Sequence, residues 1–138
     1  MILTSMRTWM TTKANITDLL DSSQAISTEK RQERTNPPYI TIKLIREFPT
    51  IMSGGVSTYN QAQIEISCEH NTDIEAYTLG KAVKDTIGAF GRGLMDTTFI
   101  NAITDIDLSQ RGEFLLAGKD RFPGYTLTIT LDYTSFNV

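Results

Sequence analysis

At 138 residues the chain has the length of one domain, enough to bury a hydrophobic core without disulfides or metal ions. A formal net charge of -3 argues against a protein that binds nucleic acid by neutralising phosphates, and a single cysteine excludes an internal disulfide. The sequence shows neither the apolar stretch of a secretory signal nor a run long enough to span a membrane, so we expect a soluble protein made in a cytoplasm.

The N-terminal part of the chain divides into a short helix and a polar connection. Five apolar residues recur on one side of a helix written from the first ten positions: Ile2, Leu3, Met6, Trp9 and Met10. Most of that side is expected to be buried. Residues 21 to 38 are polar, carry charges of both signs and end in a proline pair that cannot continue a helix. We expect them to form an exposed connection.

Four later segments alternate apolar and polar residues with the period of two that half-buried strands show. They are residues 39–48, 61–69, 99–108 and 125–133. Gly54 and Gly55 lie between the first two segments, which predicts an antiparallel hairpin with a long tip at residues 48 to 59. In the third segment, alternation predicts one face formed by Ile100, Ala102, Thr104, Ile106 and Leu108. Ile103 is predicted to lie on the opposite face.

The only cysteine and the only histidine lie two residues apart beside several carboxylates, which raises the question of a metal or catalytic site. A structural zinc site needs four ligands, and the sequence has no cysteine or histidine beyond Cys68 and His70. A catalytic Cys–His pair would also need an orienting group and an oxyanion hole, which the sequence does not indicate. We therefore expect no metal and no cofactor here, and interpret Cys68 as the last core residue of a strand.

A helix is predicted directly after this strand. Thr72 and Glu75 have the spacing of a capping box, in which two side chains satisfy backbone N–H groups at a helix start. The apolar stripe of the helix runs to about Phe90, and Gly91 suits its C-terminal cap. The stretch around Cys68 is thus interpreted as a strand-to-helix junction.

Acidic residues offer an alternative function. Asp105 and Asp107 lie on one side of a strand, and with Glu113 as a third oxygen ligand they could hold magnesium in a metal-dependent nuclease. They also occupy the polar face of an amphipathic strand, where charge is expected without any catalytic role. Because a site needs converging groups and not only acids, we favour the structural interpretation.

The order of these elements predicts an α+β fold in a single domain spanning residues 1–138. We expect a mostly antiparallel four-stranded sheet with helices packed on one face. A long hairpin tip and a long N-terminal connection complete the predicted architecture.

Three stretches also resemble a known family. They are "PYITIKLI" in the first strand, "AQIEISCEHNTDIEAYTLGKAVKDTI" in the second strand and its helix, and "GYTLTITLDYT" in the last strand. Together they cover about residues 37 to 135, and their order resembles the tail terminator (tail completion) family of long-tailed bacteriophages. Residues 22 to 36 depart from the family pattern.

The resemblance implies a structural protein of the virion and not an enzyme. Family members form a ring, typically of six copies, that caps the head-proximal end of the tail tube and ends its polymerisation. The implied partners are other copies of the chain, the tail tube protein and a head-side connector or neck protein, with no membrane contact. DNA would pass through the ring without specific binding, at the head–tail junction of a particle assembled in the host cytoplasm. Another neck component, such as a connector or stopper protein, is the nearest alternative.

The hairpin tip is the predicted contact surface. Five apolar residues surround its glycines: Phe48, Ile51, Met52, Val56 and Tyr59. Exposed apolar clusters of this kind usually mark protein–protein contacts. The alternative is that the tip folds back and covers an edge of the sheet.

Overall fold

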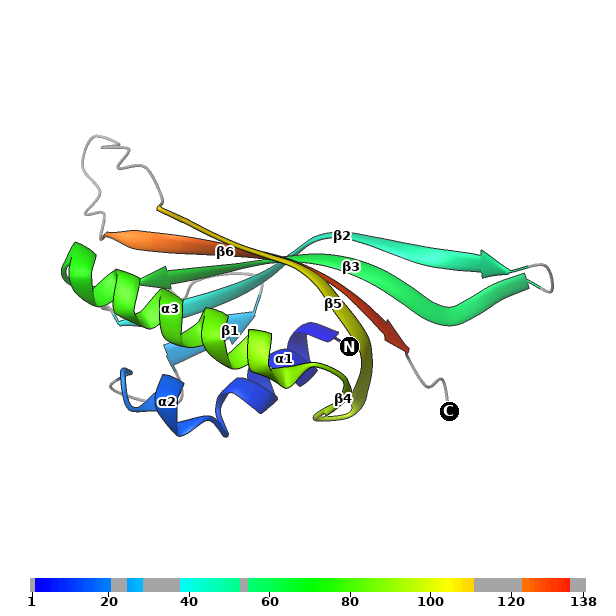
Figure 1. Cartoon of the computed structure of the whole chain (residues 1–138), viewed down its shortest axis with the longest axis horizontal. Helices are drawn as coiled ribbons and strands as arrows, with labels where there is room; N and C mark the ends of the chain where they lie inside the picture. The colour runs from blue at the N-terminus through cyan, green and yellow to red at the C-terminus, as the bar shows by residue number, and fades with distance from the viewer. Residues whose placement is uncertain (1, 21–24, 29–37, 53–54, 111–122, 135–138) are drawn as a thin grey trace.

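The computed structural model describes residues 2–20, 25–28, 38–52, 55–110 and 123–134, with the backbone alone at 49–52 and 55–59. The chain has an α+β fold (Figure 1). The helices are α1 (Ile2–Met10), α2 (Ala14–Thr17) and α3 (Asp73–Phe90). The strands are β1 (Ile26–Thr28), β2 (Tyr39–Met52), β3 (Gly55–Glu69), β4 (Gly93–Met95), β5 (Thr98–Gln110) and β6 (Gly124–Thr134).

The sheet has six strands in the order β1-β2-β3-β6-β5-β4. All neighbouring strands are antiparallel except β1 and β2, which are parallel. The four predicted strands correspond to β2, β3, β5 and β6, but the prediction of a four-stranded sheet is wrong. The two additional strands, β1 and β4, have three residues each, so no alternation identifies them in the sequence.

Strand β1 also corrects the expectation of an exposed connection over residues 21 to 38. Ala25 and Ile26 are buried, and Ile26 keeps only 1 % of its surface exposed. Ile26 pairs with Ile40 of β2, and Arg7 Nε of α1 donates a hydrogen bond of 2.7 Å to its carbonyl oxygen. The polar composition of the segment therefore does not predict this short strand, which is held by tertiary contacts.

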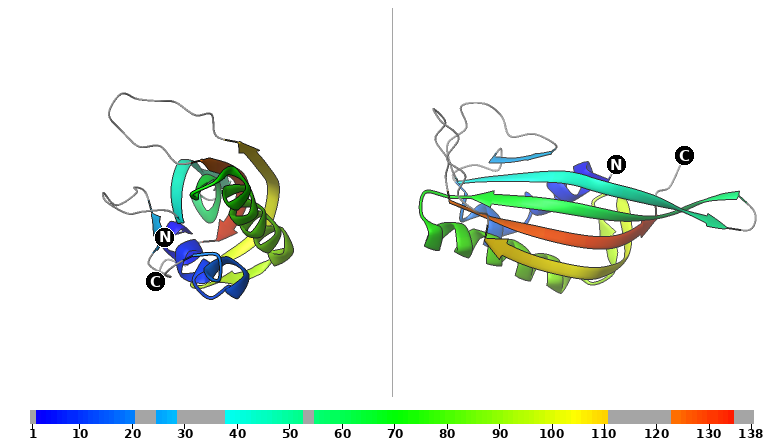
Figure 2. Two further views of the ribbon diagram at one scale, coloured as in Figure 1. Left: turned by 90° about the vertical axis from the view of Figure 1, so that its left-hand side faces the viewer. Right: turned by 90° about the horizontal axis from the view of Figure 1, so that it is seen from above.

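Strand β5 does not alternate as predicted, because two bulges interrupt its pairing with β6. The register shifts lie between Ile100 and Ala102 and between Ile103 and Asp105. Ile103 pairs with Leu131 and so belongs to the core face, whereas the prediction placed it opposite. Bulges bend a strand and increase its twist. In Figures 1 and 2, β5 curves strongly and carries β4 around the helices.

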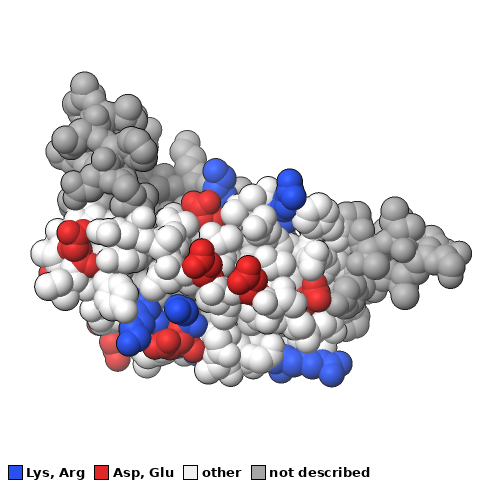
Figure 3. Space-filling view, turned by 45° about the horizontal axis from the view of Figure 1, so that its top comes forward, with Lys and Arg blue, Asp and Glu red and all other residues white. Residues whose placement is uncertain are grey.

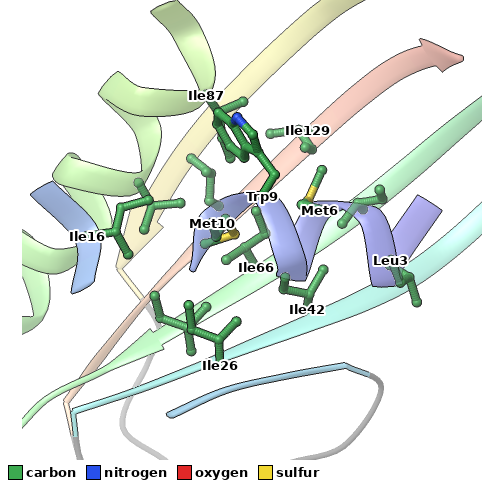
Figure 4. Packing of buried hydrophobic residues seen from close by; sticks show 14 of the residues in the cluster. Leu3, Met6, Trp9, Met10, Ile16, Ile26, Ile42, Ile66, Ile87 and Ile129 are labelled. Carbon is green, nitrogen blue, oxygen red and sulfur yellow. The ribbon is translucent and has the colours of Figure 1, made fainter. Parts of the chain in front are cut away.

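The curled sheet encloses α1 on its concave side, where all three helices lie (Figure 2). Helix α1 contacts β1 and β2 near one edge of the sheet and β4 at the opposite edge. Its buried apolar side predicted from the sequence is confirmed, and Leu3, Met6 and Met10 lie against sheet residues such as Ile42 (Figure 4). Ser5 Oγ is 2.7 Å from Thr98 Oγ1, at the β4 edge. One helix thus connects both edges.

Helix α3 covers β3, β6 and β5 with the stripe predicted from the sequence. Its buried residues are Ala76, Leu79, Gly80, Val83 and Ile87. The Thr72 half of the predicted capping box is confirmed, because the Glu75 N–H donates to Thr72 Oγ1 at 3.2 Å. The Glu75 carboxylate accepts from the Thr72 hydroxyl at 3.1 Å, instead of from the Thr72 backbone N–H that a capping box uses. Gly91, with φ of 71°, ends the helix as expected.

The hairpin of β2 and β3 is longer than predicted. Residues 48 to 59 were expected to form a tip, but pairing continues through Ile51 and Val56 to Met52 and Gly55. Strand β3 pairs with β6 only as far as Tyr59, opposite Thr134. The remaining part of the hairpin projects beyond the sheet as a two-stranded ribbon (Figure 1). We call this ribbon, residues 50–52 and 55–58, the arm.

Candidate interaction surfaces

The strand-to-helix junction holds Cys68 as a core residue. Its side chain is fully buried on the concave face of β3, between Ile40 of β2 and Tyr125 of β6. Burial, together with the neighbouring Glu69 carboxylate, raises the pKa of the Cys68 thiol to about 12. The thiol is therefore protonated at neutral pH, which is the wrong state for a nucleophile or a metal ligand.

His70 serves the local geometry of the same junction. Its backbone N–H donates to the carbonyl oxygen of Pro123 at 3.1 Å, which connects the junction to the start of β6. Its Nδ1 is 2.8 Å from the Asn71 nitrogen and 2.9 Å from Glu75 Oε2. A single ring nitrogen can either accept from Asn71 or donate to Glu75, so these two contacts are alternatives at the turn before α3. Among the described residues, no group of three or more His, Cys, Asp and Glu side chains could hold a metal ion.

The acids considered for a nuclease lie on the outer face of the sheet, away from the helices. Asp105 pairs with Thr130 and Asp107 with Thr128, and both carboxylates are exposed. Glu113, the proposed third ligand, lies outside the described residues. Figure 3 shows acidic side chains spaced over this part of the surface and not gathered around one point. The described acids therefore form a solvated face.

A cavity lies between α3 and the chain that connects α1 to α2. It is open to solvent, measures about 310 Å³ and is lined by Trp9, Lys13, Asn15, Asp85, Thr86, Ala89 and Phe90. The Trp9 and Phe90 rings meet edge to face with centroids 5.2 Å apart, and Lys13 Nζ lies 5.2 Å from the Trp9 centroid. Asn15 Nδ2 donates to Thr86 Oγ1. The bond from Asn15 to Thr86 attaches α2 to α3.

Of the five residues predicted to form the contact surface, the structure describes the side chain of Phe48 alone. Its side chain is 44 % exposed, as a contact residue requires. The side chains of Ile51, Met52, Val56 and Tyr59 lie outside the described part of the structure, although their backbones belong to β2 and β3. The alternative of a tip folded back over a sheet edge does not occur at the described backbone, which extends away from the sheet (Figure 1).

A bulge in β2 turns Phe48 outward. The register shifts between Leu44, which pairs with buried Ile64, and Arg46, which pairs with Gln63 on the outer face. Without this shift, the alternation from Ile42 and Leu44 would carry Arg46 and Phe48 into the core. We call Ile45, Arg46 and Phe48 the arm-base surface. Ile45 is 44 % exposed, and Arg46 Cζ lies 5.1 Å from the centroid of the Phe48 ring.

The same shift turns Glu47 toward the concave face. The hydroxyl of Tyr133 on β6 donates a hydrogen bond to Glu47 Oε1, across the intervening strand β3. Burial raises the pKa of Tyr133 above its ordinary value, and the bond to Glu47 contributes to the rise. This contact fixes β2 against the end of β6, at the position where the arm leaves the sheet.

A second exposed apolar surface lies at the N-terminal end of α3, and the sequence analysis did not single it out. Ile74 is 79 % exposed and Tyr77 is 45 % exposed, and both lie off the buried stripe of the helix. The Tyr77 ring meets the Tyr125 ring edge to face at 5.4 Å. We call Asp73, Ile74 and Tyr77 the helix-start surface. Its signal in the sequence is an isoleucine and a tyrosine three residues apart on the polar side of an amphipathic helix.

Two comparisons with known sequences identify no relative of this chain. A scan against models of protein families finds none that matches the chain, and a search of curated protein sequences finds no match. Within the described ranges, none of the helices combines the length and apolar character that a membrane crossing requires.

Proposed function

We propose that the protein is a structural component of a phage tail that forms a ring on the head-proximal end of the tail tube, ends tube polymerisation and joins the tail to the head connector. The observation that carries this proposal is the arm. Two paired strands extend beyond the body of the protein, with exposed Ile45 and Phe48 at their base. A projecting ribbon with exposed apolar residues is suited to contact a neighbouring protein.

Two further features support the proposal. The stretches that resemble the tail terminator family fall on β2, on β3 with α3, and on β6, which form the centre of the fold. In the proposed ring, six copies surround a passage through which DNA moves without specific binding. The net charge of -3 and the exposed carboxylates of Asp105 and Asp107 suit a surface that does not retain phosphates.

The test combines the purified protein with a polymerising tail tube protein. We expect rings in electron micrographs of the protein alone, and tubes of limited length capped at one end when it is added. The double variant Ile51→Ser/Met52→Ser should leave the melting curve of the monomer nearly unchanged, because the backbone at these positions belongs to the arm, which pairs only within the β2–β3 hairpin. It should weaken ring formation and allow tubes of uncontrolled length.

The matched control is Leu94→Ser, which removes a side chain that is also exposed and apolar but lies on β4 of the body. Normal rings and normal tube lengths with the double variant would exclude the arm as the contact surface. A wild-type protein that leaves tube length unchanged would contradict terminator function. If that protein instead bound the head-side connector, it would be a different component of the head–tail neck.

A further inference from the structure

The arm-base surface and the helix-start surface lie far apart on the molecule. The helix-start surface follows the end of β3 at Glu69, which pairs with Tyr39 of β2. Phe48 lies nine positions after Tyr39 along β2, which corresponds to about 30 Å along a strand. In Figure 1 the start of α3 and the arm accordingly lie toward opposite ends of the long axis.

Both surfaces combine two apolar side chains with one charged side chain, and the two charges have opposite sign. Arg46 places a guanidinium over the Phe48 ring at the arm base. Lys43, on the same outer face, pairs directly with Glu65 and so adds no net charge. The helix-start surface combines the exposed Asp73 carboxylate with two apolar side chains, Ile74 and Tyr77. Aromatic residues and arginine are the side chains that contribute most to protein–protein contacts. Both surfaces therefore present apolar side chains, and the charge of Arg46 is complementary to that of Asp73.

Charge also decides which kind of self-association these surfaces allow. A two-fold contact that placed either surface against its own copy would bring like charges together, arginine against arginine or aspartate against aspartate. A head-to-tail contact pairs the arm-base surface of one copy with the helix-start surface of the next. One surface of each kind stays free at the two ends of the row, so further copies can be added until a ring closes. The distance between the two surfaces allows one copy to use both at once.

We infer that the arm base of one copy packs against the start of α3 in the next copy, in a head-to-tail contact. Phe48 and Ile45 lie against Ile74 and Tyr77, and Arg46 lies opposite Asp73. The partner of each surface is a second copy of this chain. The inference rests on the proposed ring and names the residues that form its repeating contact.

The first test is a charge exchange measured by sedimentation equilibrium. Arg46→Glu alone and Asp73→Arg alone should each weaken self-association by about tenfold or more, because each places like charges opposite one another. The two substitutions combined in one chain should restore the association. Asp85→Arg is the matched control, since it reverses an exposed charge on the same helix outside the helix-start surface, and should have little effect. Melting curves of the monomers should show that every variant folds.

The second test uses disulfide trapping in a Cys68→Ala background, which removes the only cysteine. Phe48→Cys combined with Ile74→Cys should give a ladder of covalent oligomers under mild oxidation. Phe48→Cys alone should stay monomeric on a denaturing gel, since a head-to-tail contact does not place this residue beside its own copy. Phe48→Cys combined with Leu94→Cys is the control for random collision and should give no ladder.

The outcomes separate this inference from the proposed function. Rings that form normally in micrographs, without the ladder and without restoration by the charge exchange, would overturn the contact and leave the ring proposal standing. A wild-type protein that stays monomeric at every concentration tested would overturn both. Covalent dimers from Phe48→Cys alone would show a two-fold contact and also overturn the inference.

Discussion

At the scale of single residues, the bulge at Ile45 determines what the end of the sheet presents to solvent. It moves Arg46 and Phe48 to the outer face and brings Glu47 to the hydroxyl of Tyr133. The bulge therefore produces both an exposed surface at the base of the arm and a polar contact that holds β2 against β6. A regular strand would have buried an arginine and left the tyrosine hydroxyl without this acceptor.

Cys68 gives a residue-scale prediction on pH dependence. Its thiol stays protonated in the folded protein until about pH 12, whereas in an unfolded chain it ionises above its ordinary pKa of 9.0. Because the folded pKa is raised, stability is fully present below pH 9.0 and falls as the pH rises toward 12. The slope is up to about 1.4 kcal/mol per pH unit for this one proton.

Urea unfolding of the wild type and Cys68→Ala at several pH values between 8 and 11 checks this prediction. The decline should be shallower in Cys68→Ala, because tyrosine and lysine titrations are common to both proteins and cancel in the comparison. Parallel curves would mean that water reaches the thiol in the folded protein.

At the scale of elements, α3 approaches the sheet closely at one glycine. A Cβ atom added to Gly80 would lie 3.2 Å from Leu108 Cδ1 of β5 and 3.2 Å from Tyr125 Cβ of β6. The leucine methyl group can move, but the Tyr125 Cβ is attached directly to the strand backbone. Gly80 therefore sets the distance between α3 and the sheet, and it places Tyr77 against Tyr125 at the helix-start surface.

We expect Gly80→Ala to destabilise the protein by about 1–3 kcal/mol, as overpacking between well-packed elements does. Gly88→Ala is the matched control on the same helix. Its added Cβ would lie 3.7 Å from Ile106 Cδ1, an ordinary contact, at an exposed position. It should stabilise α3 by about 0.5–1 kcal/mol, because alanine favours a helix interior. Equal effects of the two substitutions on the chemical denaturation midpoint would contradict this account of the packing.

At the scale of the whole molecule, the curled sheet depends on α1. The bulges in β5 bend the sheet until β1 and β4, its two edges, both reach this helix. Arg7 binds the backbone of β1 and Ser5 binds Thr98 at the opposite edge. Helix α1 thus closes the gap between the edges and fills the concave face with Met6 and Met10.

We therefore expect α1 to unfold together with the sheet and not before it. Met6→Ala should reduce the free energy of unfolding by about 2–5 kcal/mol, because it leaves a cavity at the centre of the core. Thr4→Ala, at an exposed position of the same helix, should change it by less than about 0.5 kcal/mol.

The single tryptophan, Trp9, lies on α1 and makes the cooperativity measurable. Its fluorescence and the far-ultraviolet circular dichroism should follow one transition in urea, as expected for a single cooperative unit. A fluorescence transition at lower urea than the dichroism transition would show that α1 separates from the sheet first.

The sequence by itself determined the features that depend on near neighbours in the chain. The amphipathic stripes of α1 and α3 and the helix cap at Thr72 involve residues within a few positions of one another, so their patterns can be read in the printed sequence. The same holds for the four long strands and for the assignment of Cys68 to the core. The arm was recognised as a hairpin, but its glycines suggested a loop where pairing continues to Met52 and Gly55.

Only the tertiary structure decided the features that depend on a distant partner. A bulge such as that at Ile45 exists only relative to the strand beside it, so no pattern within β2 predicts that Phe48 turns outward. The strands β1 and β4 are too short to show a period and are strands because β2 and β5 pair with them. The curl of the sheet, the closure of its edges by α1 and the separation of the two exposed surfaces follow from these pairings, because register between remote segments is a property of the folded chain.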